Sequence, residues 1–309
     1  MENSSYRETG RKRLWLPWSG RRGARVPWRL VIPALFMYGL VVIYPAISAA
    51  WWSFTDWDGL SPQKHFVGLE NFRTFIHDGQ ALASLKNTFL LAITVTIVQN
   101  AIGLLLALGL DANIKSRNFL RTILFAPAVL PPLIVAFLWQ YIYSSEGALN
   151  RFMAAVGLGG LQQNWLGDPQ IALWVVTATV IWQFAGVSMV IFLAGLQGVP
   201  QELKDAAALD GAGAFQKFWN VTRPLIAPAT TVNLILSIIG GLKLFDQVFA
   251  MTGGGPGYAT ETLSTVIYKT AFVSGDYGYS TAIALVLTVI VAAISLVQLK
   301  ILRSQEVEG

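Results

Sequence analysis

Six apolar segments of roughly twenty residues each dominate the sequence and limit what the chain can fold into. A helix of roughly twenty apolar residues is long enough to cross the hydrocarbon core of a bilayer. Four of the segments contain no charged residue, the fifth contains Lys243 and Asp246, and the sixth has only Lys300, in its last turn. We therefore expect an all-α integral membrane protein with six spans, at 30–52, 88–110, 122–143, 172–196, 225–249 and 281–302.

The composition agrees with a membrane location. Hydrophobic residues make up 54% of the 309 residues and charged residues 13%, about half the charged share of an average soluble domain. The sequence contains no cysteine, which excludes disulfides and thiolate chemistry, and its two histidines are too few for most zinc sites.

Lysine and arginine are distributed unevenly among the segments that connect the spans. Sixteen of them lie in the N-terminal tail, the second and fourth connections and the C-terminal end, whereas five lie in the other connections. Because cytoplasmic connections carry the excess of Lys and Arg, we expect both termini in the cytoplasm. The expected organisation is a basic cytoplasmic tail at 1–28, held near anionic lipid, a six-span domain at 29–303, and a cytoplasmic end at 304–309.

Two features of the spans leave alternatives open. The first segment follows a basic tail and ends in small residues, so it also fits a cleavable signal peptide, although Trp51 and Trp52 fit an outer aromatic belt. The third and fifth segments contain helix breakers, which indicate either a watery pathway or ordinary kinks and close helix packing: Pro127, Pro131, Pro132, Gly240 and Gly241.

Residue patterns that serve enzymes are missing from the sequence. His65 and His77 lie in the first outer connection without metal-binding spacing or an evident acid partner, so we expect two solvated histidines and no metal site. No Walker A sequence is present, and the short Gly211-Ala212-Gly213 run follows no strand. The basic residues lie between apolar blocks, which gives no reason to expect a nucleic acid partner. We expect a non-catalytic chain.

The fourth connection, 198–224, has the pattern of two short helices. Pro200 can open the first helix, and Gly211 can end it in a left-handed conformation. One face of this helix carries small and apolar residues ringed by charges, and the second helix carries an aromatic face: Leu203, Ala206 and Ala207, then Phe215, Phe218 and Trp219. The pattern alone fits equally a helix inserted into a groove of a soluble partner and a helix lying on the membrane.

This connection resembles a known family motif. Residues 202–212, ELKDAAALDGA, followed by Val221-Thr222-Arg223-Pro224, resemble the EAA motif of binding-protein-dependent ABC importer permeases. Asp205, Val221 and Arg223 stand where that motif usually has Glu, Ile and Leu. The resemblance implies a coupling helix seated in an ATPase, with these residues in contact: Glu202, Leu203, Asp205, Ala206, Ala207, Asp210 and Gly211.

Other stretches are similar to the carbohydrate branch of that family, namely Val67-Gly68-Leu69-Glu70-Asn71-Phe72, Phe245-Asp246 and the run that starts at Thr252. The resemblance implies a type I importer permease in a bacterial or archaeal cytoplasmic membrane, forming half of a pathway for a sugar or related polyol. It also implies a second permease, two ATP-binding subunits that hold ATP and Mg, and an extracytoplasmic solute-binding protein. No cofactor is expected on this chain itself.

The run after the fifth span is a candidate docking site for the solute-binding protein, with a plain flexible turn as the alternative. It comprises Thr252, Gly253, Gly254, Gly255 and Pro256.

Polar residues within the spans are candidates for the solute pathway. They are Gln99, Asn100, Gln140, Gln183, Asn233, Ser237, Lys243 and Asp246. Neutral amides can donate to and accept from sugar hydroxyls, and the alternative is hydrogen bonding between helices. Lys243 and Asp246, at i and i+3, are expected to neutralise each other, either as a structural pair or as a gate or substrate contact. An ion-coupled secondary transporter using this pair is the competing function.

Overall fold

The computed structural model describes residues 28–112 and 114–303, and they are mostly helical. The expected tail at 1–28 lies almost wholly outside these residues, and the end at 304–309 lies entirely outside them. The described part contains no β-sheet, only one isolated bridge between Thr55 and Phe66. The α-helices are α1 (Trp28–Tyr38), α2 (Tyr44–Trp52), α3 (Glu70–His77), α4 (Gly79–Asp111), α5 (Arg117–Val129), α6 (Pro132–Ile142), α7 (Ala148–Ala155), α8 (Ala172–Gln197), α9 (Gln201–Leu209), α10 (Ala214–Lys217), α11 (Arg223–Leu225), α12 (Ala227–Leu242), α13 (Asp246–Thr252), α14 (Leu263–Phe272) and α15 (Tyr277–Arg303).

The chain divides into two compact units, residues 1–47 and 48–309. In the first unit, α1 continues through the π-helical turn η1 (Gly39–Ile43) into α2. Pro45 follows this turn closely, and a proline cannot donate to the carbonyl one α-helical turn earlier. The same arrangement recurs in the second unit, where the π-helical turn η3 (Phe218–Thr222) comes just ahead of Pro224. Widening the helix by one residue is how both segments accommodate their proline.

Four helical segments are long and apolar enough to cross a membrane, at 31–52, 79–111, 172–197 and 277–302. Two further helix pairs pass the same test together but are sharply bent, which gives up to six spans if each bent pair counts as one. The six spans expected from the sequence are therefore reached only if each bent pair counts as one span. Helix α4 begins nine residues before the predicted second span, because Asp78 caps it by accepting from the backbone N–H groups of Gln80 and Ala81.

The third predicted span is not one straight helix. Its two halves, α5 and α6, meet at an angle of 96°. Pro131 and Pro132 lack N–H donors, and Pro131 also forces Leu130 into an extended conformation with ψ 137°. The break therefore follows directly from the two consecutive prolines.

The fifth predicted span is also interrupted. The helical segments 214–225 and 227–242 are bent by 72° where they meet, between α11 and α12. Helix α12 then ends at Leu242, and α13 begins only at Asp246, so the segment between them is not helical. The prediction of one continuous span at 225–249 is wrong in this respect.

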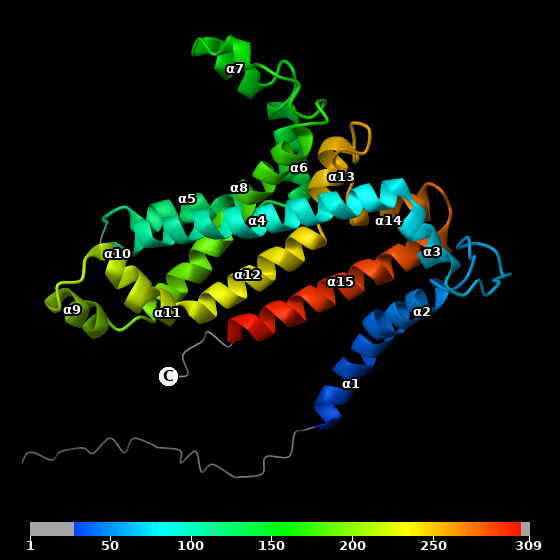
Figure 1. Cartoon of the computed structure of the whole chain (residues 1–309), viewed down its shortest axis with the longest axis horizontal. Helices are drawn as coiled ribbons and strands as arrows, with labels where there is room; N and C mark the ends of the chain where they lie inside the picture. The colour runs from blue at the N-terminus through cyan, green and yellow to red at the C-terminus, as the bar shows by residue number, and fades with distance from the viewer. Residues whose placement is uncertain (1–27, 113, 304–309) are drawn as a thin grey trace, which may run out of the picture. The chain divides into compact units, whose positions relative to one another are not determined.

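The core of the second unit is built on α4 and α8, which lie side by side with α12 (Figure 1). Small residues allow the close approach of these helices. A Cβ at Gly103 of α4 would lie 2.5 Å from the Ser188 Cβ of α8, and one at Gly241 of α12 would lie 2.7 Å from Cα of Ala92. Close packing thus accounts for Gly241, while Gly240 has open space beside it.

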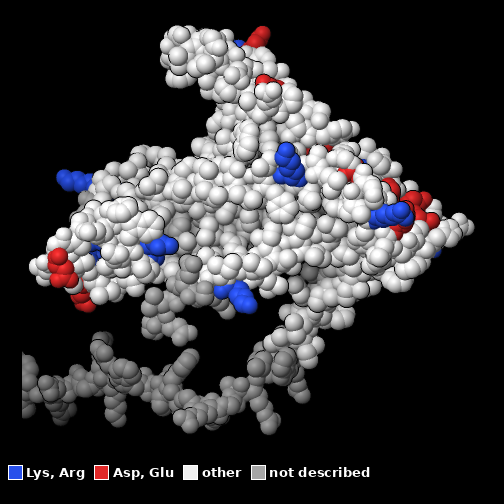
Figure 2. All heavy atoms as spheres, viewed as in Figure 1, with Lys and Arg blue, Asp and Glu red and all other residues white. Residues whose placement is uncertain are grey.

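Acidic side chains on the face shown in Figure 2 gather near α9 and, at the opposite end of this unit, near α3 and α14. Most of the surface between these two ends is uncharged. This distribution agrees with helices that cross an apolar layer and expose their charged connections on either side.

Candidate functional site

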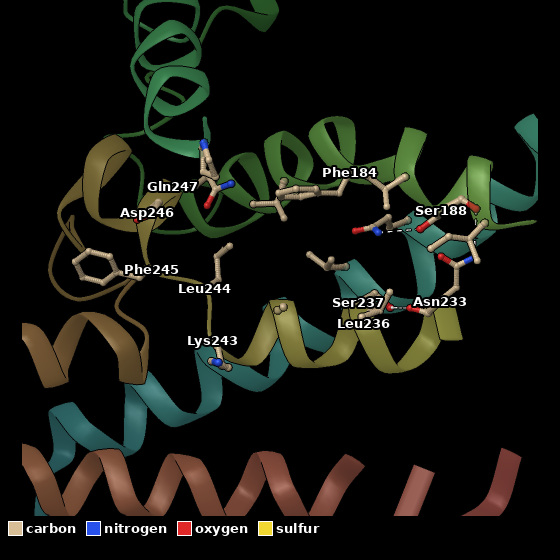
Figure 3. A pocket seen from close by; sticks show the side chains of 18 residues that line it. Phe184, Ser188, Asn233, Leu236, Ser237, Lys243, Leu244, Phe245, Asp246 and Gln247 are labelled. Carbon is tan, nitrogen blue, oxygen red and sulfur yellow. Dashed lines mark hydrogen bonds between the residues drawn. The ribbon is translucent and has the colours of Figure 1, made fainter. Parts of the chain in front are cut away.

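A cavity of about 340 Å³ lies where α12 ends and α13 begins (Figure 3). We call it the Lys243 cavity. Helices α4, α8, α12 and α13 line it, and most of its wall is apolar. Five of the predicted pathway residues lie on its wall: Gln99, Asn233, Ser237, Lys243 and Asp246.

Hydrogen bonds between helices hold the amides of the Lys243 cavity. Gln99 Nε2 donates to Ser188 Oγ at 2.9 Å, and Asn233 Nδ2 donates to the Ser188 carbonyl at 3.2 Å. Ser188 of α8 therefore joins α4 and α12 on one wall. The two predicted roles of these amides, contact with the solute and hydrogen bonding between helices, are compatible. Each side chain makes an interhelical hydrogen bond and still lines the cavity.

Lys243 and Asp246 do not form the expected pair. The helix breaks between them, and Figure 3 shows them on opposite sides of Leu244. No ion pair joins them within the described residues, and both side chains are exposed in this chain. The i, i+3 argument fails because it assumed a continuous helix, and Lys243 instead follows the last residue of α12.

Gln183 and Gln140 lie outside the wall of the Lys243 cavity. Gln183 is fully buried: its Nε2 donates to the Leu130 carbonyl at 3.1 Å, and its Oε1 accepts from Gln247 Nε2 at 2.9 Å. Gln140 Nε2 donates to the Met251 carbonyl at 3.3 Å and joins α6 to α13. Gln247, which does line the cavity, was missed because no helix break was expected beside it.

A second cavity, of about 520 Å³, lies next to the 198–224 connection. We call it the Arg223 cavity, and it contains the remaining predicted pathway residue, Asn100. Its wall combines residues of α4, α8, η3, α12 and the end of α15: Asn100, Ala101, Leu104, Phe192, Phe218, Trp219, Arg223, Pro224, Ile226, Ala227, Thr230, Thr231 and Leu302.

The predicted coupling helix is α9. It follows Pro200 as the sequence predicts, and Gly211 has a left-handed φ of +81°. The Ala212 N–H donates to the Ala207 carbonyl at 2.9 Å and the Gly211 N–H to the Ala208 carbonyl at 3.1 Å, which is the Schellman pattern of helix termination. None of the residues in α9 is buried, and the predicted contact residues Glu202, Leu203, Asp205, Ala206 and Asp210 are all exposed.

One contact ties this connection to the spans, and a second group of contacts holds the connection together internally. Lys204 Nζ lies 3.6 Å from Asp111 Oδ2 at the end of α4. On the second short segment, the Arg223 guanidinium lies over the Trp219 ring at 4.6 Å from its centroid, and Trp219 also contacts Phe215 and Phe218. Arg223, one of the three residues that depart from the motif, thus packs on the predicted aromatic face.

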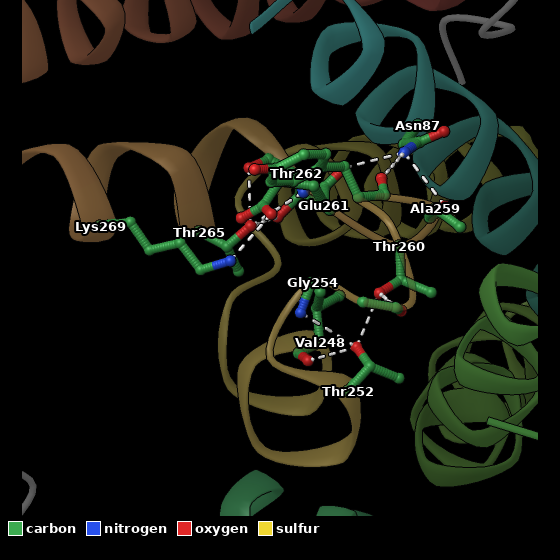
Figure 4. Close-up of polar contacts among 12 residues, drawn as sticks. Asn87, Val248, Thr252, Gly254, Ala259, Thr260, Glu261, Thr262, Thr265 and Lys269 are labelled. Atoms are coloured by element: carbon green, nitrogen blue, oxygen red, sulfur yellow. Dashed lines mark hydrogen bonds and ion pairs between the residues drawn. The ribbon is translucent and has the colours of Figure 1, made fainter. Parts of the chain in front are cut away.

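The predicted docking run is internally hydrogen bonded (Figure 4). Gly253 and Gly254 have φ values of +60° and +87°, which glycine adopts without strain. Thr252 Oγ1 and Thr260 Oγ1 lie 2.7 Å apart, and Thr260 Oγ1 also donates to the Gly255 carbonyl at 2.8 Å. These bonds hold both ends of the loop against each other.

Glu261 anchors the same loop from inside. Its side chain is completely buried, and its Oε2 lies 2.9 Å from Lys269 Nζ of α14. The Asn87 amide of α4 donates to the Ala259 and Glu261 carbonyls at 3.2 and 3.1 Å (Figure 4). Glu261 and Lys269 were missed because eight residues separate them and no helix was expected at 263–272.

The first outer connection contains an acid partner for His65 that sequence reasoning did not find. His65 Nδ1 lies 3.0 Å from Asp56 Oδ2, on an exposed surface. Hydrogen bonds from His65 hold the pKa of Asp56 below its usual value. His77 Nδ1 instead bonds the Arg73 carbonyl, and no group of His, Asp or Glu able to hold a metal occurs in the described parts of the chain.

Residues 99–304 match the family model of the binding-protein-dependent transport system inner membrane component. The chain belongs to this family. The permease chain is 34% identical to the multiple sugar-binding transport system permease protein MsmF of Streptococcus mutans, over 91% of this chain and 96% of that protein. It is 32% identical to the trehalose/maltose transport system permease protein MalF of Thermococcus litoralis, with 91% and 95% covered. It is also 31% identical to the sn-glycerol-3-phosphate transport system permease protein UgpA of Agrobacterium fabrum, with 91% and 95% covered.

Solved structures confirm the fold of the permease chain. A chain of a bacterial ABC transporter involved in the import of the acidic polysaccharide alginate matches it with a TM-score of 0.79 at 24% identity, over 90% of this chain and 94% of that one. The predicted all-α type I permease fold and the resemblance to importer permeases are therefore confirmed. An ion-coupled secondary transporter is set aside, because the relatives are permeases of binding-protein-dependent systems.

Proposed function

We propose that the permease chain forms half of the pathway by which an ABC importer brings a sugar or related polyol across the cytoplasmic membrane. The observation that carries this proposal is its likeness, over nine tenths of its length, to permease proteins of sugar and glycerol phosphate systems. The Lys243 cavity supports the class of solute, because amide and hydroxyl groups line its mostly apolar wall beside Lys243 and Asp246, and such groups can bind sugar hydroxyls.

Movement of the solute would be driven from outside this chain. No residue of helix α9 is buried in the isolated chain, and the helix ends in an ordered turn, which suits a rigid helix seated in a partner. We propose that two ATP-binding subunits hold ATP and Mg and that one of them receives α9. Closure of the ATPase pair would then pull on the spans through α9, whose Lys204 is already tied to α4.

Two further partners belong to the proposed importer. A second, similar permease would complete the pathway, and a solute-binding protein would dock on the outer connections. The 252–256 run suits docking because its hydrogen bonds present its backbone in a fixed conformation. Both termini would lie in the cytoplasm, as the distribution of Lys and Arg predicts.

The proposal is tested by uptake in cells that lack the chain. We expect deletion to abolish uptake of one or more radiolabelled sugars or polyols, among them maltose, trehalose and sn-glycerol 3-phosphate. Expression of the chain should restore uptake, whereas Gly211→Trp should be assembled in the membrane yet fail to restore it. Normal uptake of every tested solute in the deletion strain would contradict the proposal.

A further inference from the structure

The Arg223 cavity has a positive charge on its wall and no carboxylate to balance it. Among the described residues that line this cavity, Arg223 is the only charged one. Its guanidinium lies over the Trp219 ring, and no hydrogen bond or ion pair joins it to another described residue. A guanidinium carries five N–H donors in a planar fork that matches a phosphate group. The cavity therefore offers an unpaired cation to a ligand that carries an anion.

The charged residue borders the opening of the cavity, and the deeper wall is apolar. Arg223 and Trp219 are both exposed, whereas Phe192 and Ile226 on the same wall are each only 2% exposed. Leu302, half-buried at the end of α15, continues the apolar wall. A cation at the mouth and hydrocarbon within match an amphiphile that has an anionic head.

The polar side chains deeper in the cavity do not require a polar ligand. The Thr230 and Thr231 hydroxyls donate to carbonyls four residues earlier in the chain, at 3.1 and 3.0 Å. Asn100 Nδ2 donates to the Thr96 carbonyl and to Ser237 Oγ, and its Oδ1 is closed off from the cavity. Hydrocarbon can therefore lie against these residues without leaving a donor unpaired.

The cavity lies where membrane spans end. Leu302 is the last residue of the candidate span 277–302, and Ile226 lies at the bend between segments 214–225 and 227–242. The ends of spans lie near the headgroups of a bilayer. The adjoining 198–224 connection is on the side that the distribution of Lys and Arg predicts to be cytoplasmic, and the cytoplasmic leaflet carries anionic lipid.

Arg223 is a feature of this chain and not of the EAA motif, which usually has leucine at this position. It follows directly on the π-helical turn η3, and two residues of that turn, Phe218 and Trp219, line the same cavity. Widened turns of this kind occur frequently at functional sites. The departure from the motif thus adds a charge where a leucine would only extend the apolar wall.

We propose that the Arg223 cavity binds an anionic phospholipid, with the phosphate of its headgroup on the Arg223 guanidinium and an acyl chain against Phe192 and Ile226. A neutral sugar fits less well, because it would leave the guanidinium without an anion. The inference goes beyond the proposed function, since it needs a chain in a membrane but no particular solute.

Lipid binding to the assembled, purified transporter tests the proposal. Native mass spectrometry during titration with phosphatidylglycerol or phosphatidylcholine counts the bound molecules. We expect one phosphatidylglycerol to bind the wild type several-fold more tightly than Arg223→Leu, which restores the usual residue of the motif. Arg223→Gln, which keeps more of the polar shape, is the second variant and should behave like Arg223→Leu. Arg117→Leu is the matched control, because Arg117 is an exposed arginine that does not line the cavity, and it should bind as the wild type does.

The absence of cysteine allows the ligand to be placed in the cavity. Thr230→Cys puts the only thiol of this chain on the wall of the Arg223 cavity. In nanodiscs, we expect phosphatidylglycerol, compared with phosphatidylcholine alone, to slow its modification by uncharged methyl methanethiosulfonate several-fold. Adding Arg223→Leu should remove this protection. Gly240→Cys is the control, since it lies on the Lys243 cavity with open space beside it, and its modification should not depend on the lipid.

Three results would overturn the proposal. Equal phosphatidylglycerol binding by the wild type, Arg223→Leu and Arg223→Gln would show that Arg223 does not hold the headgroup. Protection of Thr230→Cys by inorganic phosphate or sn-glycerol 3-phosphate in phosphatidylcholine nanodiscs would assign the site to a soluble phosphate. Protection by maltose or trehalose, and not by phosphatidylglycerol, would assign it to the solute. None of these readouts depends on uptake, so failure here is distinct from failure of the proposed function.

Discussion

Gln247 Nε2 donates a 2.9 Å hydrogen bond to Gln183 Oε1, with both side chains almost completely buried. Because Gln183 in turn donates to the Leu130 carbonyl, this chain of amides links the breaks of the third and fifth spans to α8. The Leu130 carbonyl needs such a donor, because Leu130 lies in the break between α5 and α6 and no backbone N–H of the described residues donates to it.

Replacing Gln183 alone should therefore lower the stability of the protein. We expect Gln183→Leu to destabilise the assembled protein by about 1–3 kcal/mol, because the Gln247 amide and the Leu130 carbonyl lose their partner in a buried place. The double variant Gln183→Leu/Gln247→Leu should lose less than the sum of the two single variants. Thermal unfolding of the purified complex, followed for all four proteins, measures the difference. Strict additivity would show that the two amides are independent.

Gly211 should tolerate asparagine better than alanine. Its φ of +81° strains any residue with a Cβ, by about 1–2 kcal/mol, and asparagine adopts this region more readily than alanine. Nothing lies within 4 Å of a Cβ placed there, so crowding within this chain plays no part. We expect solute transported per ATP hydrolysed to fall in the order glycine, asparagine, alanine. Equal coupling in all three would show that the left-handed turn is not needed.

The Lys204–Asp111 pair should contribute modestly to the stability of the protein and more clearly to the coupling of ATP hydrolysis to solute transport. Both side chains are partly exposed, so the pair is worth about 0.2–1 kcal/mol. Lys204→Glu should speed hydrogen exchange in α9 and lower coupling by placing two acids together. The swapped variant Lys204→Glu/Asp111→Lys should recover much of both, and failure to recover would assign Lys204 a contact outside this chain.

Loss of the Glu261 carboxylate should loosen the outer loop. Glu261→Ala removes the partner of Lys269, a charge-assisted bond worth about 1.5–3 kcal/mol, and leaves space beside Gly254. We expect faster hydrogen exchange across 252–262 and weaker capture of the solute-binding protein. Glu261→Gln keeps the shape and serves as the comparison. Unchanged exchange in the alanine variant would mean that the Asn87 bonds are sufficient.

The first outer connection should loosen on acidification. Ser61 donates to Asp58 from its hydroxyl and its backbone N–H, and Leu60 also donates, which lowers the pKa of Asp58 from 3.8 to about 2. A lowered pKa means that the turn is fully stabilised above pH 3.8 and loses that stabilisation as the pH falls toward 2. At neutral pH, Asp58→Ala should imitate this loss and raise amide exchange at Leu60 and Ser61, with Asp56→Ala leaving those two amides unchanged.

Local patterns in the sequence predicted four of the membrane-length helices and the two short helices of the 198–224 connection. Pro200, Gly211 and the face of Leu203 each act within a few residues, so spacing alone places them. The non-helical residues from Lys243 to Phe245 escaped prediction because the stretch around them is mostly apolar, contains no proline, and is followed by helix α13. Glu261 with Lys269, and Gln183 with Gln247, escaped because tertiary packing, which spacing does not encode, brings them together.

At Gly103, α4 and α8 lie so close together that no side chain fits between them, since an added Cβ would lie 2.5 Å from the Ser188 Cβ. We therefore expect these two helices to move together during transport. Deformation then falls on the places where helical hydrogen bonding is already interrupted, at Leu130–Pro131 and between Lys243 and Phe245. We thus expect the hinges of the permease chain where the spans are broken, and its rigid part where glycine brings helices together.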